Sequence, residues 1–300
     1  MEMSAQCLLC TFRKQAETVA QYSDEVKKAA YLKEVARYLG SLGPDDSSPY
    51  VSAEINKLHE QYFGFTRDLS DLKRIYNERM LRMEKEIEGK ILAADDPLRA
   101  ALQYARAGNY IDFGAMDSVD DDKLAEILDG AQGEILDPEE YACFVRELGS
   151  AHAFLEILDN AGEIVMDKLL IRQLKRQFPH LEIACMVRGK PIHNDVTMED
   201  ADSVGLTEEC SVISSGDGIA GTEIERISTQ ARRAIEAADV ILSKGQGNFE
   251  TLLGCGFNVY YLFLNKCDWY MQFFRTERFH GMFINDRRTN MTKYLKDMPC

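Results

Sequence analysis

The sequence predicts an α/β protein in which a mostly helical N-terminal part precedes a mostly parallel sheet with helices on both faces. Two patterns predict this fold. Up to residue 150, apolar residues recur at the three- and four-residue spacing of amphipathic helices. From residue 151, short apolar runs alternate with amphipathic segments, which is the pattern of parallel strands joined by helices. We therefore expect a helical region over residues 1–150 and an α/β region over residues 151–300.

Five segments of the N-terminal region are expected to form helices. One of them has clear end signals, because Asp96-Pro97 precedes its apolar pattern and Gly108 follows it. The stretch GPDDSSP, residues 43–49, is expected to be a turn or the N-terminal cap of a helix. The expected helical segments are 13–43, 70–92, 96–108, 121–130 and 137–149.

Five short apolar runs of the C-terminal region are expected to be strands, and the segments between them helices. In a parallel sheet of this kind, ligands bind outside the carboxyl ends of the strands, so the residues that follow each strand are the candidates for a site. The expected strands are 153–158, 181–189, 210–216, 239–245 and 258–264, and the expected helices are 162–178, 197–206, 222–238 and 247–256.

Composition and charge exclude several classes of protein. The chain has 300 residues, of which 45% are hydrophobic and 28% charged, as in a soluble globular protein. It contains no apolar run of membrane-span length and no signal peptide, so we expect a cytoplasmic protein without a membrane partner. The formal charge of −15 argues against non-specific binding of nucleic acid. An anionic substrate would therefore need local positive charge from a metal, a Lys or a helix N-terminus.

Most of the eight cysteines are expected to be small buried hydrophobic residues. Cys7 and Cys10 form the exception, because they make a CxxC pair with no second pair at zinc-finger spacing. We favour a structural role at the start of a helix for this pair. Metal or redox chemistry stays an alternative.

Polar residues follow four of the expected strands. Asp159-Asn160-Ala161-Gly162 follows the first strand, Asn194-Asp195 the second, SSGDGIAGT the third, and Lys244-Gly245 closes the fourth. Carboxylate and amide oxygens suit a hard divalent cation such as Mg²⁺ or Mn²⁺. Glycine-bearing turns that open helices suit a phosphate. The sequence therefore predicts that these groups meet at one edge of the sheet.

Each of these residues also has a plainer interpretation. Asp159 and Asn194-Asp195 could be helix caps or turns, and Lys244 could be a solvated strand end. His193, beside Asn194, is more often a surface or satisfied histidine than a ligand. Separate caps need not place two carboxylates and a Lys at one edge, so their convergence favours a site.

The stretch GDGIAG, residues 216–221, has the glycine spacing of a dinucleotide-binding turn. The rest of that motif is missing, because the following strand ends in Ser243-Lys244 and not in an acidic residue that would hold a ribose. Binding of a nicotinamide cofactor or of S-adenosylmethionine is therefore an alternative of lower weight.

Four blocks of the sequence resemble the signature blocks of the metal-dependent damage-control phosphatase family, formerly domain of unknown function 89. The chain is most similar to the prokaryotic-type branch, which also tends to carry an N-terminal CxxC. The resemblance extends from that pair to about Leu264. The blocks are AGNYIDFGA, DNAGEIVMDKLLI, GKPIHNDVTMEDA and SKGQGNFETL.

The resemblance implies a helical part packed on a Rossmann-like sheet, and a metal site made of Asp159, Asn160 and Asp195. It also implies that Lys244 contacts phosphate and that Asn109 and Asp112 belong to the site. We expect backbone N–H groups near Ala161 and Gly162 to assist, and we include Asn194 and Gly245 among the phosphate-binding candidates. The chain departs from the family pattern at His193, at Ala220 and in its aromatic segment 265–288, which concerns the shape of the substrate.

These expectations together describe a phosphatase that uses Mn²⁺, Co²⁺, Ni²⁺ or Mg²⁺ to hydrolyse phosphate monoesters of small metabolites such as sugar phosphates, in metabolite damage control. One alternative is an S-adenosylmethionine-dependent carboxyl methyltransferase, an activity proposed for a eukaryotic branch of the family. Another is a non-catalytic metal- or nucleotide-binding module. The physiological substrate, the choice between direct attack by water and a phospho-aspartate, and the oligomeric state are left open by the sequence.

Overall fold

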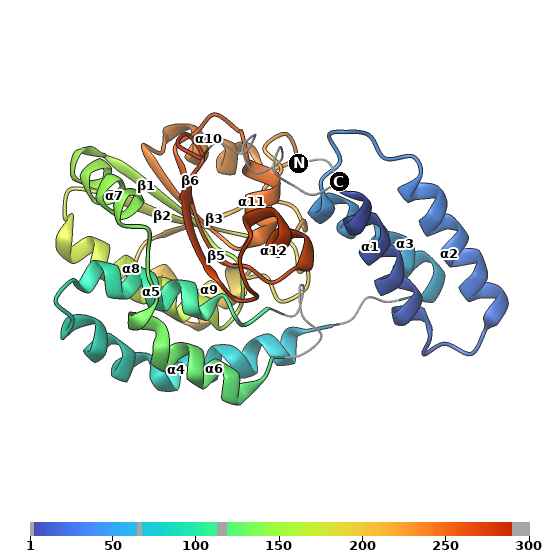
Figure 1. Ribbon diagram of the computed structural model, residues 1–300, viewed down its shortest axis with the longest axis horizontal. Helices are drawn as coiled ribbons and strands as arrows, with labels where there is room; N and C mark the ends of the chain where they lie inside the picture. The colour runs from blue at the N-terminus through green and yellow to red at the C-terminus, as the bar shows by residue number, and fades with distance from the viewer. Residues whose placement is uncertain (1–2, 65–67, 113–118, 290–300) are drawn as a thin grey trace.

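The computed structural model describes residues 3–64, 68–112 and 119–289 and contains the expected sheet with helices on both faces (Figure 1). Six strands lie in the order β3-β2-β1-β4-β5-β6. The first five are parallel, and β6 pairs with β5 in the antiparallel sense. The strands are β1 (Ala153–Ile157), β2 (Glu182–Val187), β3 (Ser211–Ser214), β4 (Val240–Lys244), β5 (Val259–Leu264) and β6 (Gly281–Asn285).

The helices precede the sheet in the first half of the chain and alternate with strands in the second half. None of the helices within the described residues is long and apolar enough to cross a membrane. The helices are α1 (Ala5–Val19), α2 (Glu25–Leu39), α3 (Ser48–Phe63), α4 (Ser70–Leu92), α5 (Pro97–Gly108), α6 (Asp121–Gly130), α7 (Pro138–Ser150), α8 (Glu163–Gln177), α9 (Met198–Ser203), α10 (Thr229–Ala237), α11 (Gln246–Leu252) and α12 (Asp268–Phe274). The 3₁₀ helices are η1 (Ala131–Gly133) and η2 (Leu206–Glu208).

The period of two along each strand divides the core between the two faces of the sheet. In β1, Phe154 packs with the helices α4, α5 and α8, whereas Leu155 and Ile157 pack with α10, α11 and α12. Both sets of side chains are almost fully buried. As a result, the face of the sheet to which a strand side chain points follows from the number of residues between it and these core residues.

The hydrophobic cores divide the chain near residue 65 and not at residue 150. Helices α1, α2 and α3 have a small core of their own, and they lie to one side of the sheet in Figure 1. Helices α4 to α7 instead share the core of the sheet. The boundary expected at residue 150 therefore marks the place where the strands begin, whereas the division between the two hydrophobic cores lies earlier in the chain.

Several expected element boundaries were wrong. The segment 13–43 forms two helices, because Asp24 accepts a hydrogen bond from the Lys27 N–H and starts a new one. The segment 222–238 becomes helical only at Thr229, where Ser228 is the N-cap. The body of α3, the short helix α12 and the strand β6 were not expected, although the cap at residues 43–49 is confirmed by Ser47 at the start of α3.

The reversal of strand order between β1 and β4 creates the crevice in which sheets of this kind bind ligands. The connection from β1 runs toward β2 and β3, whereas β4 leads to β5 on the other side. The loops after β1 and β4 therefore separate at this point. Asp159 follows β1 and Lys244 ends β4, so both border the crevice.

We predict that Phe144→Ala lowers the free energy of unfolding by about 3–5 kcal/mol, because the ring is buried among other aromatic rings. Its ring centroid lies 4.9 Å from Tyr260, 5.6 Å from Phe283 and 6.4 Å from Phe154. Ile135→Ala is the control, because Ile135 is 78% exposed and its loss should change stability by less than about 0.5 kcal/mol. Urea denaturation measures both variants. Equal losses would contradict this assignment of the core.

Candidate functional site

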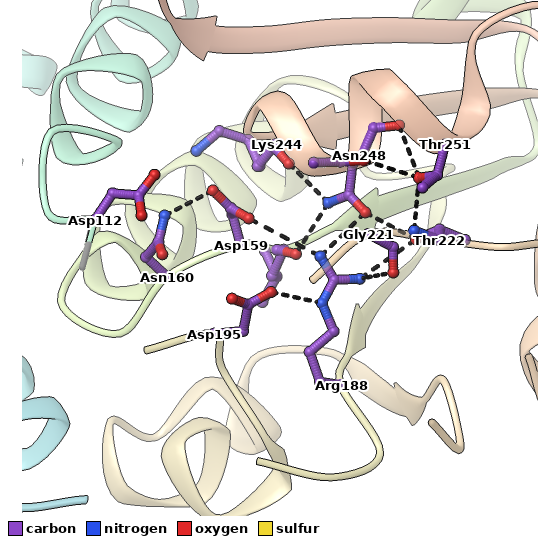
Figure 2. A network of polar contacts seen from close by, with 12 residues as sticks. Asp112, Asp159, Asn160, Arg188, Asp195, Gly221, Thr222, Lys244, Asn248 and Thr251 are labelled. Atoms are coloured by element: carbon purple, nitrogen blue, oxygen red, sulfur yellow. Dashed lines mark hydrogen bonds and ion pairs between the residues drawn. The ribbon is translucent and has the colours of Figure 1, made fainter. Parts of the chain in front are cut away.

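Asp159 lies at the centre of a polar network beyond the end of β1 (Figure 2). Its Oδ2 atom accepts hydrogen bonds from Asn160 Nδ2 at 2.6 Å and from Asn109 Nδ2 at 3.1 Å. Its Oδ1 atom is 3.9 Å from the Arg188 guanidinium. The carboxyl group is 7% exposed. Burial, followed by the nearby charge of Asp195, holds the pKa of Asp159 well above its ordinary value.

Asp195 brings a second buried carboxylate to the same place. It forms an isolated antiparallel bridge with Asn160, so the loop after β2 lies against the loop after β1. Burial raises the pKa of Asp195 to about 6, although Arg188 opposes the shift. Asp159, Asn160 and Asp195 are thus brought together, as the sequence predicted.

Arg188 joins the two carboxylates and was not anticipated. Its Nε atom donates to Asp195 Oδ2 at 2.8 Å, its Nη1 to the Gly221 carbonyl at 2.7 Å and its Nη2 to Asn248 Oδ1 at 3.1 Å. It is fully buried and follows β2 directly. A charged residue at the end of a strictly apolar run was the available signal, because such a residue is buried only when it is paired.

Glu163 is the second unanticipated residue, and it accepts from several donors at the start of α8. Asn109 Nδ2 donates to both of its carboxylate oxygens, at 2.9 and 3.1 Å, and Asn160 Nδ2 donates at 3.0 Å. Asn109 itself is oriented by the Leu264 N–H, which donates to its Oδ1. Asn109 therefore belongs to the site, where it holds Asp159 and Glu163 in place.

Lys244 lies in the interior of the protein, beneath the polar network. Its side chain shares the face of β4 on which Val240 and Leu242 pack, and it is fully buried. Its Nζ donates to Glu163 Oε1 and Asp167 Oδ1, each at 2.6 Å, and to the Ala105 carbonyl at 3.0 Å. All three ammonium donors are used inside the protein. Because these partners occupy the ammonium, the contact between Lys244 and phosphate that the resemblance implied stays a prediction.

The backbone groups expected to bind phosphate also have partners inside the protein. The Ala161 N–H donates to the Asn194 carbonyl at 2.8 Å, and the Gly162 N–H donates to Asn77 Oδ1 at 2.6 Å. Asn194 uses its own Nδ2 to hold the Ile111 carbonyl. These residues fix the loop after β1, so their N–H groups support the site and do not offer donors to it.

Gly245 has a steric role at the site. Its φ is +80° and its ψ is 159°, a combination that residues with a side chain avoid. A Cβ atom at this position would overlap the Asp159 carboxylate. The glycine therefore allows the backbone after β4 to approach Asp159 closely.

Lys266 and Asp112 form a buried ion pair near Asp159. The Lys266 Nζ lies 2.6 Å from Asp112 Oδ2, and its charge lowers the pKa of Asp159 against the effect of burial. Lys266 follows β5 and was not anticipated. The signal was its place after an apolar run, which is the same signal that pointed to Lys244.

His193 lies between the site and the N-terminal helices. Its Nε2 is 3.5 Å from the Ser52 hydroxyl of α3, and its φ of +45° is unusual for a residue with a side chain. Burial, followed by the charge of Lys14, lowers its pKa to about 4, so the ring is neutral at pH 7. Cys7 and Cys10 lie farther along the same unit, one turn apart in α1, as free thiols.

The glycines of residues 216–221 serve packing. A Cβ at Gly216 would meet Ser228, and one at Gly221 would meet the Gly247 carbonyl. No helix begins directly after this segment, since α10 starts at Thr229. The segment therefore lacks the turn-to-helix context of a dinucleotide-binding motif.

The donor set suits a divalent cation with oxygen ligands. Asp159 and Asp195 each have one carboxylate oxygen held by protein donors, which leaves the other oxygen to a ligand. Across the described ranges, no group of three or more His, Cys, Asp or Glu side chains could hold a metal. The third donor would here be an amide oxygen, that of Asn160, which is a normal ligand for Mg²⁺ or Mn²⁺. Two buried carboxylates with raised pKa values also fit a site that a cation would neutralise.

A protein-family model, described as the damage-control phosphatase ARMT1-like domain, matches residues 3–279. Among curated proteins, the chain is 30% identical to a protein named damage-control phosphatase from Pyrococcus horikoshii, covering 89% of this chain and 92% of that one. It is 29% identical to a protein of the same name from Archaeoglobus fulgidus, covering 82% and 84%. An uncharacterised protein of Methanocaldococcus jannaschii is 31% identical, covering 78% and 71%.

The fold is also that of a solved structure. A DUF89 family protein from Pyrococcus horikoshii superposes with a TM-score of 0.77 and 26% identity, and the alignment covers 95% of this chain and 99% of that chain. The two chains therefore share their fold over nearly their whole lengths.

We predict that Gly245→Ala destabilises the protein by more than Gly254→Ala does. Both glycines have positive φ, which costs alanine about 1–2 kcal/mol, but nothing lies within 4 Å of a Cβ at Gly254. At Gly245 the overlap with Asp159 should add about 1–3 kcal/mol. Urea denaturation measures both. The excess should shrink in an Asp159→Ala background, and an excess of unchanged size there would show that Asp159 is not the obstacle.

Proposed function

The chain belongs to the damage-control phosphatase family, and we propose that this phosphatase uses a divalent cation to hydrolyse phosphate monoesters of small metabolites such as sugar phosphates. The observation that carries the proposal is the pair of buried carboxylates, Asp159 and Asp195, on either side of Asn160 at the crevice of the sheet. Two buried acids that are close enough to repel each other are costly unless a cation offsets their charge.

The cation would be held by Asp159, Asn160 and Asp195, and Mn²⁺, Co²⁺, Ni²⁺ and Mg²⁺ all accept such oxygen ligands. When bound, it would polarise a phosphoryl oxygen and lower the pKa of a bound water. The protein contributes the positions of the ligands. Arg188 holds Asp195 through Nε, and Asn109 holds Asp159 through Nδ2.

We assign the contact with the phosphate to Lys266. Of the three cations near Asp159, Lys244 uses all three donors in the interior, and Arg188 is bound to Asp195, Asn248 and a carbonyl. The Lys266 side chain is also buried, but the described partner of its ammonium is a single carboxylate, that of Asp112, which is partly exposed. A phosphate anion can replace or share that partner and receive a charge-assisted hydrogen bond.

Methyl transfer is less well supported. The glycine-rich segment 216–221 packs against Ser228 and Gly247 and opens no helix, so it offers no site for the cofactor of a methyltransferase. The formal charge of −15 does not favour nucleic acid as a partner. A small phosphorylated metabolite is therefore the proposed substrate class.

We predict that chelation abolishes phosphate release and that Mn²⁺, Co²⁺, Ni²⁺ or Mg²⁺ restores it. Phosphate release from a panel of sugar phosphates measures this, with methyl transfer from S-adenosylmethionine assayed in parallel. The reason is that the carboxylate and amide oxygens of the site cannot offset the negative charge of the phosphoryl group without a bound cation. Full activity after exhaustive chelation, or methyl transfer without phosphate release, would contradict the proposal.

We also predict that affinity for Mn²⁺ increases as the pH rises through about 6. The Asp195 carboxyl has a pKa raised to about 6 and must lose its proton before it binds a cation, so binding releases protons. Below that pH the affinity should fall by about tenfold per pH unit. Calorimetry at pH 5 and pH 7.5, in buffers of different ionisation enthalpy, measures both affinity and proton release. Equal affinity at the two pH values would contradict this role of Asp195.

We further predict that Asp159→Asn and Asp195→Asn each lower kcat/KM by more than about a hundredfold without lowering the melting temperature of the metal-free protein. The amide removes a ligand charge while relieving the cost of a buried carboxylate. Asp217→Asn is the matched control, because Asp217 follows the neighbouring strand β3, its carboxylate accepts from the Ser215 hydroxyl, and its bonds to Gly189 and Lys190 are made by the backbone carbonyl, which the substitution keeps. Wild-type kinetics in either test variant would overturn the ligand assignment.

A further inference from the structure

We propose that Glu163 and Lys244 are positioning residues that hold the Asn160 amide with its oxygen toward the cation and its NH₂ group toward the interior. This inference rests on the proposed function, because it assigns Asn160 to the cation. It gives Lys244 a role that differs from the phosphate contact implied by the sequence resemblance. Four groups form a chain of direct contacts, in the order Asn160, Glu163, Lys244 and Asp167.

An asparagine ligand has to be oriented, because only one end of its amide can bind a cation. The amide oxygen is an acceptor, and the NH₂ group is a donor of two hydrogen bonds. In this structure the Asn160 Nδ2 donates to Asp159 Oδ2 at 2.6 Å and to Glu163 Oε2 at 3.0 Å. Both donors are thereby used, and the amide oxygen is left for a ligand.

Glu163 enforces this orientation, because every described partner of its carboxylate is a donor. It receives hydrogen bonds from Asn109, Asn160 and Lys244. A reversed Asn160 amide would place its oxygen against a carboxylate oxygen, with no hydrogen between them. In a site closed to water, that arrangement loses a hydrogen bond and adds repulsion.

Lys244 makes a carboxylate possible at this depth. Glu163 is 0% exposed, and a buried carboxylate needs a counter-charge. The Lys244 ammonium supplies it at 2.6 Å. Although burial opposes its charge, the carboxylates of Asp167, Glu163 and Glu156 raise the pKa of Lys244 above its ordinary value. Lys244 therefore stays protonated in the interior of the protein.

The placement follows from the regular elements. Lys244 lies two and four residues after Leu242 and Val240, so it points to the face of the sheet that α5 and α8 cover. On α8, Glu163 and Asp167 are four residues apart and thus lie on the same side of the helix. Packing of α8 on β4 brings the three charges together. Of these three residues, only Glu163 also contacts Asn160.

Asp167 supplies a matched control on the other side of Lys244. Its Oδ1 lies at the same 2.6 Å from the ammonium, but none of its described contacts reaches Asn160. Burial, opposed by Lys244, raises the pKa of Asp167 to about 7, so a neutral side chain is a fair replacement. Asp167→Asn therefore changes the surroundings of Lys244 without touching the proposed ligand.

The experiment measures Mn²⁺ affinity by calorimetry on the metal-free full chain for wild type, Glu163→Gln, Lys244→Met and Asp167→Asn. We expect Glu163→Gln and Lys244→Met each to weaken Mn²⁺ binding about 10–100-fold, as losses of groups that orient metal ligands do. Asp167→Asn should stay within about threefold. At saturating Mn²⁺, kcat with a sugar phosphate should return to within a few fold of wild type. The double variant Glu163→Gln/Lys244→Met should lose no more than the worse single variant, because the two residues act as one unit.

The outcomes separate this inference from the function on which it rests. Wild-type protein that fails to bind Mn²⁺ would overturn both. Normal Mn²⁺ affinity in Lys244→Met, with a lost kcat that saturating metal does not restore, would overturn only the inference and return Lys244 to the phosphate. If Lys244→Met fails to fold, as near-UV circular dichroism would show, the isosteric Glu163→Gln variant decides, and normal affinity there overturns the inference.

Discussion

The ion pair between Lys244 and Glu163 joins the interior of the sheet to the polar network at its edge. Below the pair are a carbonyl of α5 and a carboxylate of α8; above it are the amides of Asn109 and Asn160. Without the ammonium, Glu163 would be an unpaired charge in the core, which typically costs about 3–5 kcal/mol. The geometry of the site therefore depends on the packing of α5 and α8 on β4. The groups that support the site are buried.

The same rule, that buried charge must be compensated, organises the rest of the crevice. Arg188 offsets Asp195 and approaches Asp159, while Lys266 offsets Asp112. Burial raises the pKa values of Asp159 and Asp195, and neighbouring acids, Asp195 for the first and Asp112 for the second, add to the effect. A divalent cation would complete the compensation, so the proposed chemistry agrees with the electrostatics of the network.

The N-terminal helices are attached to the same edge of the sheet that carries the site. In α3, the Ser47 hydroxyl donates to Glu223, Tyr50 lies under the Arg226 guanidinium and Ser52 approaches His193. These contacts reach the loops after β2 and β3. A unit with its own small core thus rests on the loops that hold Arg188 and Asp195, and it forms one wall above them.

The sequence by itself determined the family, the phosphatase activity, the succession of the five parallel strands along the chain with the helices between them, and the meeting of Asp159, Asn160 and Asp195. These follow from local periodicity, from motifs and from the rule that parallel strands end at one edge. Tertiary structure alone decided which groups compensate the buried charges. Lys244 and Lys266 each stand at or just after the end of an apolar run, so their surroundings in the chain do not distinguish them. Only the packing of α5 and α8 on β4 turned the first inward, onto Glu163, and left the second beside Asp112. Side-chain direction at a strand end depends on which face is covered, and that is a property of contacts between residues far apart in the chain.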